Sequence, residues 1–204
     1  LAYGISAVGL GKRLNISKQS LRELIIKYLD KGVLERRGHK IIIRPNPLSL
    51  KLSLIFWKSL DPLDYENFLS ELPQSLRKPL VEQLQQLGNV DYAKNFVEKA
   101  WGLDGNFSKA EILNSNMGSH LFRSIVTVNP EATIKVLTKN YLDKPKDYLV
   151  TIVEGRQNLV WALERLCFRK ETFVEAAKVL MCFSVAEIET YYSNNATDYF
   201  TQLF

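Results

Sequence analysis

Cysteine and histidine are scarce in this chain, with two of each among 204 residues. Cys167 and Cys182 cannot form a disulfide framework, so a cytoplasmic location is expected. His39 and His120 lie far apart, and neither has a cysteine or carboxylate at the spacing of metal ligands, which argues against a zinc site. No apolar run approaches the ~20 residues that a membrane-spanning helix needs, so no membrane partner is expected.

Signatures of common enzyme classes are also missing. Residues 9–13 resemble the end of a phosphate-binding loop, but Ser6 replaces its first glycine and Arg13 stands where Ser or Thr should hold magnesium. No Gly-x-Ser-x-Gly elbow surrounds Ser119 and His120. The acidic pair Glu187 and Glu189 is interpreted as a solvated helix face. The sequence therefore predicts a non-catalytic chain, with no catalytic residue and no metal ligand assigned.

The composition that remains is that of a globular protein, with 46% apolar and 24% charged residues. Charge is divided unevenly along it. Residues 1–60 carry 12 Lys and Arg against three acidic residues, a net charge of +9, whereas residues 61–204 carry −4. This predicts two domains, 1–60 and 61–204, with different partners. Because Leu1 stands where Met would, we expect a piece of a longer chain.

Local signals in the basic part predict a winged helix. A short helix is expected over 8–14, and Ser17 is a good N-cap for a longer helix over 18–31, which Gly32 ends. Strands are expected over 33–37 and 40–44, with a hairpin tip at Gly38 and His39. A helix-turn-helix followed by a two-stranded wing is a winged helix, whose first helix would lie in residues 1–7 or before them.

Two functions fit such a module. In the first, the longer helix enters the major groove of DNA and the wing contacts phosphates. In the second, the module packs against another domain and its basic residues face solvent or an acidic surface. The residues that would make either kind of contact are Lys12, Arg13, Lys18, Gln19, Arg22, Arg36, Arg37, His39 and Lys40.

From Pro47 onward, strand signals nearly vanish and an array of paired helices is expected. Residues 47–60 are apolar on most faces, which predicts a helix buried between the two domains. Residues 102–118 are expected to form a longer connection. A repeat is suggested by 135–137 and 178–180, which read Lys-Val-Leu 43 residues apart, each after a cap-like residue, Asn129 or Thr172. Further helices are expected at 62–72, 75–87, 91–101, 118–127, 130–141, 156–168, 171–183 and 185–192.

Four segments carry a resemblance to a known family. Residues 41–50 read IIIRPNPLSL and resemble the exit of the winged helix in large bacterial STAND NTPases, which are signal-transducing ATPases. Residues 129–132 (NPEA), 155–166 (GRQNLVWALERL) and 192–204 are similar to their helical region. The matches occur in the right order over nearly the whole chain, although none of them is a catalytic signature.

The resemblance implies a place in a larger machine. Family members carry an effector, a P-loop ATPase, a winged helix and a helical sensor array, and bacterial members of this type act in antiviral defence. This chain would be the winged helix and the start of the sensor, without the ATPase. ATP or ADP and magnesium would then belong to the parent chain, and no cofactor is assigned to these residues. The partners would be the adjacent NTPase domain and a protein ligand of the array.

One residue is singled out by this resemblance. In related ATPases, a Met-His-Asp motif ends the winged helix and its His touches the ADP phosphate. The comparable exit here is 43–45, where Arg44 replaces that His and would supply the positive charge. Alternatively, Arg44 is a strand-end arginine that pairs with Glu35 or another carboxylate.

The leading functional interpretation is a regulatory and sensor part of a STAND ATPase, which couples nucleotide state to protein recognition. The second is a winged-helix transcription regulator whose helical domain binds a ligand or dimerises. The third is an enzyme whose site the sequence does not reveal. In the STAND interpretation, the winged helix mostly packs against the nucleotide domain, which makes DNA binding less favoured.

Overall fold

The computed structural model of the chain describes residues 16–38, 40–44, 46–59, 68, 70–72, 74–88, 90–187 and 196–203. Helices dominate these residues, and the sheet found among them has two antiparallel strands. The mainly helical fold class predicted from the sequence is therefore confirmed. The expected helix over 8–14 lies outside the described residues.

The N-terminal elements follow local sequence signals closely. They are α2 (Lys18–Asp30), β1 (Leu34–Arg37), β2 (Lys40–Ile43) and α3 (Asn46–Ser59). The Ser17 hydroxyl accepts the amide N–H of Ser20 at 3.0 Å, which caps α2 as expected. Gly32 ends α2 at a φ of 67°, and Gly38 turns the hairpin at a φ of 60°. The hairpin pairs Leu34 with Ile43 and Arg37 with Lys40.

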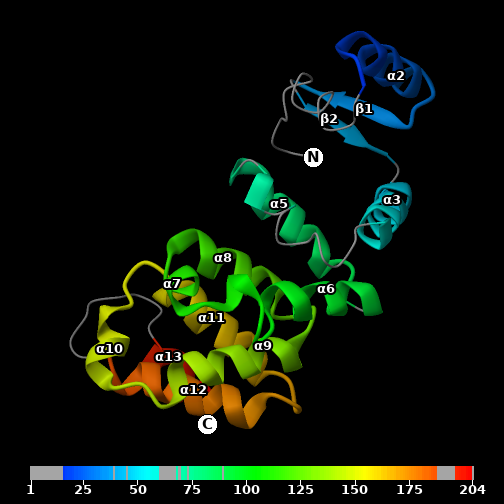
Figure 1. The fold of residues 1–204 in the computed structure, drawn as a ribbon. Coiled ribbons are helices and arrows are strands. Elements are labelled where there is room, and N and C mark those ends of the chain that lie inside the picture. The colour runs from blue at the N-terminus through cyan, green and yellow to red at the C-terminus, as the bar shows by residue number, and fades with distance from the viewer. Residues whose placement is uncertain are drawn as a thin grey trace.

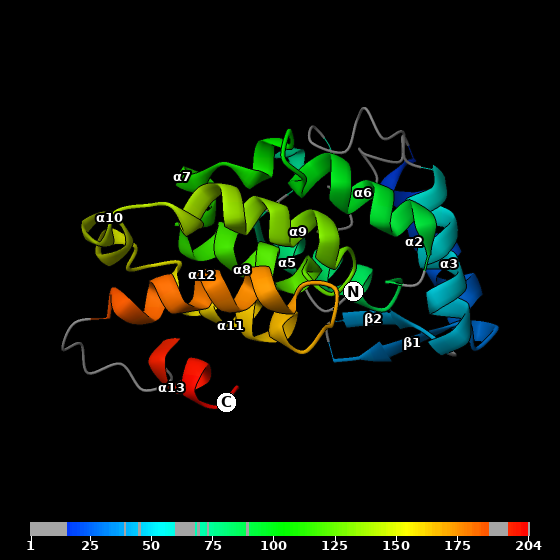
Figure 2. The same ribbon diagram turned by 90° about the horizontal axis from the view of Figure 1, so that it is seen from below.

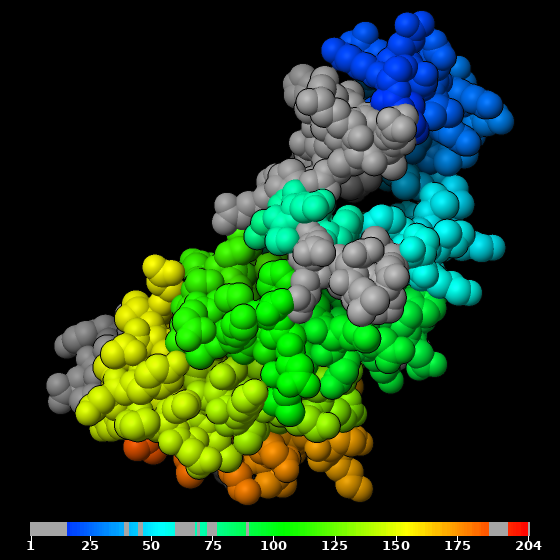
Figure 3. Space-filling model, viewed as in Figure 1, coloured from blue at the N-terminus to red at the C-terminus, as the bar shows by residue number. Residues whose placement is uncertain are grey.

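Helix α3 joins these elements to the rest of the molecule (Figure 1). Figure 3 shows α2 and the hairpin, in blue, at one end of the molecule, with α3 in cyan between them and the large body. The sequence predicted that α3 would be buried, but Trp57 is its one buried side chain among those described. The reason is that only one face of α3 meets α6 (Asp91–Trp101), where Trp57 contacts Phe96 with ring centroids 4.6 Å apart.

The body, here called the helical unit, covers the described residues from 74 to 203. Figure 2 shows several of its helices running side by side, in particular α8, α9, α11 and α12. One apolar core runs through it, and Phe122, Leu163, Leu180 and Phe183 are fully buried there. Beyond α6, its elements are α5 (Gln74–Gln85), the 3₁₀ turn η2 (Asn106–Ser108), α7 (Ala110–Leu113), α8 (Asn116–Ile125), α9 (Pro130–Leu137), the π-helix η3 (Thr138–Leu142), α10 (Lys146–Thr151), α11 (Arg156–Cys167), α12 (Phe173–Val185) and α13 (Ala196–Thr201).

Several expected bounds need correction. The connection expected over 102–118 contains η2 and α7, and the helix expected over 130–141 ends at Leu137 and continues as a π-helix. Helix α12 runs to Val185, so no separate helix begins there, and residues 188–192 lie outside the described residues. Within the expected helix over 62–72, residues 68, 70 and 71 are helical, Leu72 lies in a bend, and the other residues are outside the described ranges. Helices α10 and α13 were not predicted.

The two Lys-Val-Leu segments lie in α9 and α12, which contact each other. In both, the lysine is exposed and the Val and Leu are buried. Asn129 caps α9 as expected, because its side chain accepts the N–H of Ala132 at 3.1 Å. Thr172 is not the matching cap, since its hydroxyl donates to the carbonyl of Leu166 at 2.7 Å instead. The burial pattern is shared by the two segments, whereas the capping is not.

Candidate functional site

The predicted contact residues of α2 lie in its first two turns. Lys18, Gln19 and Arg22 are exposed there. Lys18 and Arg22 are four residues apart and therefore share a face of the helix. The Gln19 amide donates to the carboxylate of Glu23 at 3.3 Å, so it is partly engaged within α2. Lys18 and Arg22 form no ion pair with the described residues, and two such cationic side chains at the start of a capped helix are compatible with either predicted kind of contact.

The hairpin holds a small charge cluster around Glu35. This carboxylate accepts from the Arg37 Nε at 2.9 Å and pairs with the Arg44 Nε at 2.6 Å. The hydrogen bond from Arg37 holds the pKa of Glu35 below its usual value, with help from the charges of Arg37 and Arg44. The pairing of Arg44 with Glu35, one of the two alternatives drawn from the sequence, is thus present. All three side chains are well exposed, so these pairs add little stability.

The structure describes the other predicted contact residues to different extents. Arg36 is exposed on β1, on the opposite face of the strand from Glu35, and it has no ion pair with any described residue. Lys40 begins β2, where only its backbone is described. Lys12, Arg13 and His39 lie outside the described residues.

Large apolar side chains are unusually exposed on α2 and α3. Seven of them have between 37% and 57% of their surface exposed, and they are Leu24, Ile26, Tyr28, Leu50, Leu52, Ile55 and Phe56. The described residues from 74 to 203 expose the same number over a far longer stretch of chain. Dense exposure of large apolar side chains is typical of a surface that another protein covers.

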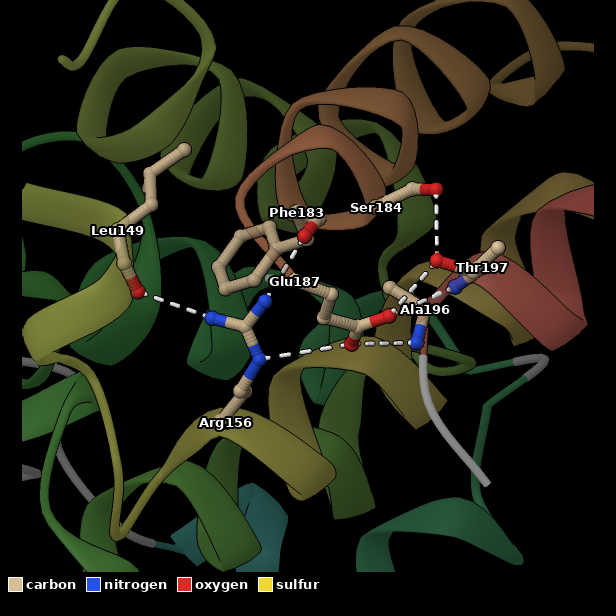
Figure 4. Close-up of polar contacts among 7 residues, drawn as sticks. All are labelled: Leu149, Arg156, Phe183, Ser184, Glu187, Ala196 and Thr197. Atoms are coloured by element: carbon tan, nitrogen blue, oxygen red, sulfur yellow. Dashed lines mark hydrogen bonds and ion pairs between the residues drawn. The ribbon is translucent and has the colours of Figure 1, made fainter. Parts of the chain in front are cut away.

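A buried polar network holds the C-terminal helix α13 (Figure 4). The Arg156 guanidinium donates to the carbonyls of Leu149 and Phe183 at 2.9 and 2.8 Å. Its Nε lies 3.5 Å from Glu187, and the two side chains are 11% and 6% exposed. Glu187 accepts the backbone N–H groups of Ala196 and Thr197 at 2.6 and 2.9 Å.

The polar groups of this network bond to one another and hold α13 in place. Both carboxylate oxygens of Glu187 are occupied by the N-terminal amides of α13, which a carboxylate caps well. Thr197 adds a hydroxyl bond to Glu187 at 3.0 Å and accepts one from Ser184 at 3.0 Å. The sequence interpretation of Glu187 as a solvated residue is therefore wrong, because the partner that buries it, Arg156, lies 31 residues earlier.

The adjacent side chains of Ser119 and His120 do not form a hydrogen-bonded nucleophile–base pair in the helical unit. Ser119 donates to the carbonyl of Asn116 and accepts from Asn158, so it does not bond to its neighbour His120. Burial lowers the pKa of His120, with further lowering by Lys78 and Arg123. Burial raises the pKa of the Cys167 thiol to about 11 and also raises that of Cys182. The described residues hold no group of three side chains suited to a metal ion.

A hollow of about 350 Å³ lies between the η2–α7 segment and the π-helix η3. Its polar walls are already bonded to each other. The Lys139 Nζ donates to the carbonyl of Leu103 at 3.3 Å, and the Asn140 amide donates to that of Ser108 at 2.8 Å. Its lining carries two charges of each sign, since Asp104 and Glu111 are matched by Lys109 and Lys139. The hollow therefore offers no concentrated charge for a ligand.

Comparison with known proteins adds no relative. No family model, no curated protein and no solved structure matches this chain. None of the helices in the described ranges has the length and apolar character needed to cross a membrane. Function is therefore inferred from the surfaces and contacts described above.

Two of the surfaces and contacts described above were not predicted from the sequence. One is the exposed apolar surface of α2 and α3, because a sequence does not show which faces find a partner. The other is the Arg156–Glu187 pair. A signal for it existed, since Arg156 is the first residue of a helix, where an acidic residue would be favoured and a cation needs a compensating partner.

Proposed function

We propose that this chain is a non-catalytic regulatory and sensor part of a STAND-type ATPase. In this proposal, α2 and the hairpin belong to a winged helix that packs against the nucleotide-binding domain, and the helical unit binds a protein ligand. ATP or ADP with magnesium would be held by the nucleotide-binding domain. The chain would couple nucleotide state to protein recognition, in the setting of phage defence that the family resemblance suggests.

The observation that carries the packing role is the dense apolar exposure on α2 and α3. Ile26 and Ile55 are 57% and 56% exposed, although each is large enough to gain about 1.5–3 kcal/mol from full burial. DNA phosphates offer no apolar surface to cover such side chains. A neighbouring protein domain does.

Arg44 remains the proposed contact for the nucleotide phosphate. In the described chain its charge is balanced by Glu35, at the exposed edge of the hairpin. An exposed pair costs little to break, so a phosphate could take the place of the carboxylate. Arg44→Ala in the longer protein should then loosen ADP retention, while Arg36→Ala, on the opposite face of β1, should leave it unchanged.

DNA binding is the second proposed function, and a specific observation favours it. Lys18, Arg22 and Arg36 are exposed and form no ion pair with the described residues. A DNA reader that uses such residues should lose affinity by about 0.9 log units per contacted phosphate for each log unit of salt. Weak binding that is blind to sequence and vanishes near physiological salt would contradict this second proposal.

The test of the leading proposal begins with the native coding region. We expect a Gly-x-x-x-x-Gly-Lys-Ser/Thr loop upstream of this segment, and a native start codon close to Leu1 would rule the proposal out. Ile26→Cys and Ile55→Cys then report coverage in the longer protein. Their maleimide labelling should slow at least about tenfold relative to the 204-residue chain.

Val153→Cys is the matched control, because Val153 is 65% exposed on the helical unit and should label equally in both proteins. The native thiols add little background, since burial raises the pKa of both. Equal labelling of Ile26→Cys and Ile55→Cys in the two proteins would contradict the packing role.

A further inference from the structure

Three arginines gather along the seam between α8 and α11, which lie side by side (Figures 1 and 2). Arg123 projects from α8. Trp161 and Arg165 are four residues apart on α11 and share its face, and Arg169 follows four residues later, just past the helix end. We call these four residues the arginine seam. Its sequence signal is the spacing Trp-x-x-x-Arg-x-x-x-Arg.

The first arginine of the seam is held in a fixed position. The Arg123 guanidinium stacks over the Trp161 ring, 3.9 Å from its centroid. It also donates a long hydrogen bond of 3.4 Å to Asn158, whose own amide donates to Ser119 at 3.1 Å. The Trp161 indole N–H donates to the Tyr199 hydroxyl at 2.8 Å. Ring and guanidinium are thus ordered before any ligand arrives.

Among the described residues, the arginines of the seam bond only to neutral oxygens. Arg165 donates to the carbonyl of Arg123 at 3.5 Å, and Arg169 donates to that of Thr127 at 3.4 Å. None of them forms an ion pair within 4.0 Å with a described carboxylate. Burial lowers the pKa of Arg123 and the charge of Arg165 lowers it further, while the charge of Glu164 opposes this lowering. Half-buried like charges without a paired anion are costly to keep together.

We propose that the arginine seam binds an acidic peptide segment of a partner protein. A carboxylate of that peptide would bridge Arg123 and Arg165, and a second would reach Arg169 one helical turn away. Phe168, which is 76% exposed beside Arg169, would cover an apolar residue of the peptide. This inference deepens the proposed function and rests on it, because it names the chemistry of the protein ligand of the helical unit.

Charge favours a peptide over a nucleic acid at this face. Residues 61–204 have a net charge of −4, which opposes a continuous phosphate backbone. Glu164, between Trp161 and Arg165, would lie against such a backbone as well. A short segment with two or three carboxylates needs only the local positive charge of the seam.

The test uses the 204-residue chain and a synthetic peptide that repeats Asp-Phe-Glu-Leu three times. Trp161 is the one half-exposed tryptophan, whereas Trp57 and Trp101 are buried. In a ¹H–¹⁵N spectrum, the peptide should therefore shift the indole signal of Trp161 and leave the other two in place. A peptide that repeats Asn-Phe-Gln-Leu should shift none of them.

Matched variants distinguish binding at the arginine seam from a nonspecific effect of net charge. Arg123→Gln with Arg165→Gln should weaken peptide binding by about tenfold or more, while Lys135→Gln with Lys178→Gln, an equal change of charge at two exposed sites outside the seam, should not. Glu164→Gln should strengthen binding, which a misfolded variant would not do. Thermal melts confirm that each variant is folded.

The outcomes are distinct. An absent Trp161 shift, or equal effects of the two double variants, would overturn the inference. So would a Trp161 shift caused by oligo-dT and not by the acidic peptide, which would identify a nucleic-acid surface. Failure here leaves the thiol-labelling result at Ile26 and Ile55 untouched, so the packing role of α2 and α3 is judged separately.

Discussion

The two ends of the molecule differ in how they use apolar residues. In α2 and α3, Leu21 and Trp57 are buried, and seven other large apolar side chains lie open among the described residues. In the helical unit, a continuous core covers most of the large apolar side chains, and the seven exposed ones are spread over a far longer stretch of chain. Since a small module with little covered apolar surface is marginal by itself, α2, the hairpin and α3 should depend on a neighbour far more than the helical unit does.

The largest expected effect comes from comparing the same substitution, leucine to alanine, in the helical unit and in α3. Leu180→Ala, at a site with 0% exposure in α12, should lower the free energy of unfolding by about 3–5 kcal/mol, because it leaves a cavity. Leu52→Ala, at a site with 40% exposure in α3, should change it by less than about 1 kcal/mol. Urea denaturation followed by circular dichroism measures both. Equal losses would mean that α3 is as well packed as the core.

A second comparison concerns buried and exposed ion pairs. Arg156→Met should cost about 3 kcal/mol, because Glu187 would stay buried without its cation. Lys78→Met removes a pair with Glu82 in which both side chains are 47% exposed, and should cost less than about 1 kcal/mol. Thermal unfolding at neutral pH gives both values. A silent Arg156→Met would show that α13 is held by its apolar contacts alone.

The turn of the hairpin tests whether the two ends unfold together. Gly38→Ala should destabilise the hairpin by about 1–2 kcal/mol, because Gly38 has a φ of 60°. Gly88→Ala is the control, since an added Cβ there would meet its neighbours at ordinary contact distances. Hydrogen exchange should register the Gly38 effect at the amides of β1 and β2. If the melting of the helical unit shifts as well, the two ends form one cooperative unit and the contrast fails.

The smallest expected effect is a pH dependence in the hairpin. Because the folded pKa of Glu35 is lowered from 4.5, its pairs stabilise the hairpin above that pH. Their contribution is lost as the pH falls through the lowered pKa. Arg37→Gln should raise the Glu35 pKa towards 4.5, as measured by carboxyl NMR titration. Arg36→Gln, on the other face of β1, should leave it unchanged, and an equal rise there would contradict the described pairing.

Sequence reasoning succeeded where the cause is local. Ser17, Gly32 and Gly38 each fix the backbone within a few residues, so α2 and the hairpin were predicted close to their true bounds. The short helices α10 and α13 were missed, because a helix of six residues gains its stability from the surfaces it meets and not from its own sequence.

Sequence reasoning failed where the cause is a distant partner. Thr172 has the right residue type for a cap, yet its hydroxyl is taken by the carbonyl of Leu166. Glu187 is of a residue type that is usually solvated, yet its side chain is buried in an ion pair with Arg156. Of the candidate contact residues, Lys18, Gln19, Arg22, Arg36 and Arg37 lie at the surface, and the pairing of Arg37 with Glu35 was not foreseen.

Trp57 lies where α3 packs against α6, and its fluorescence can report this contact. Its indole is buried against Phe96, and its N–H finds no hydrogen-bond partner among the described residues. An indole in such dry, apolar surroundings fluoresces at short wavelength, and its emission moves to longer wavelength when water reaches it. With Trp101 and Trp161 replaced by Phe, the emission wavelength of Trp57 would report in real time whether α3 is packed against α6.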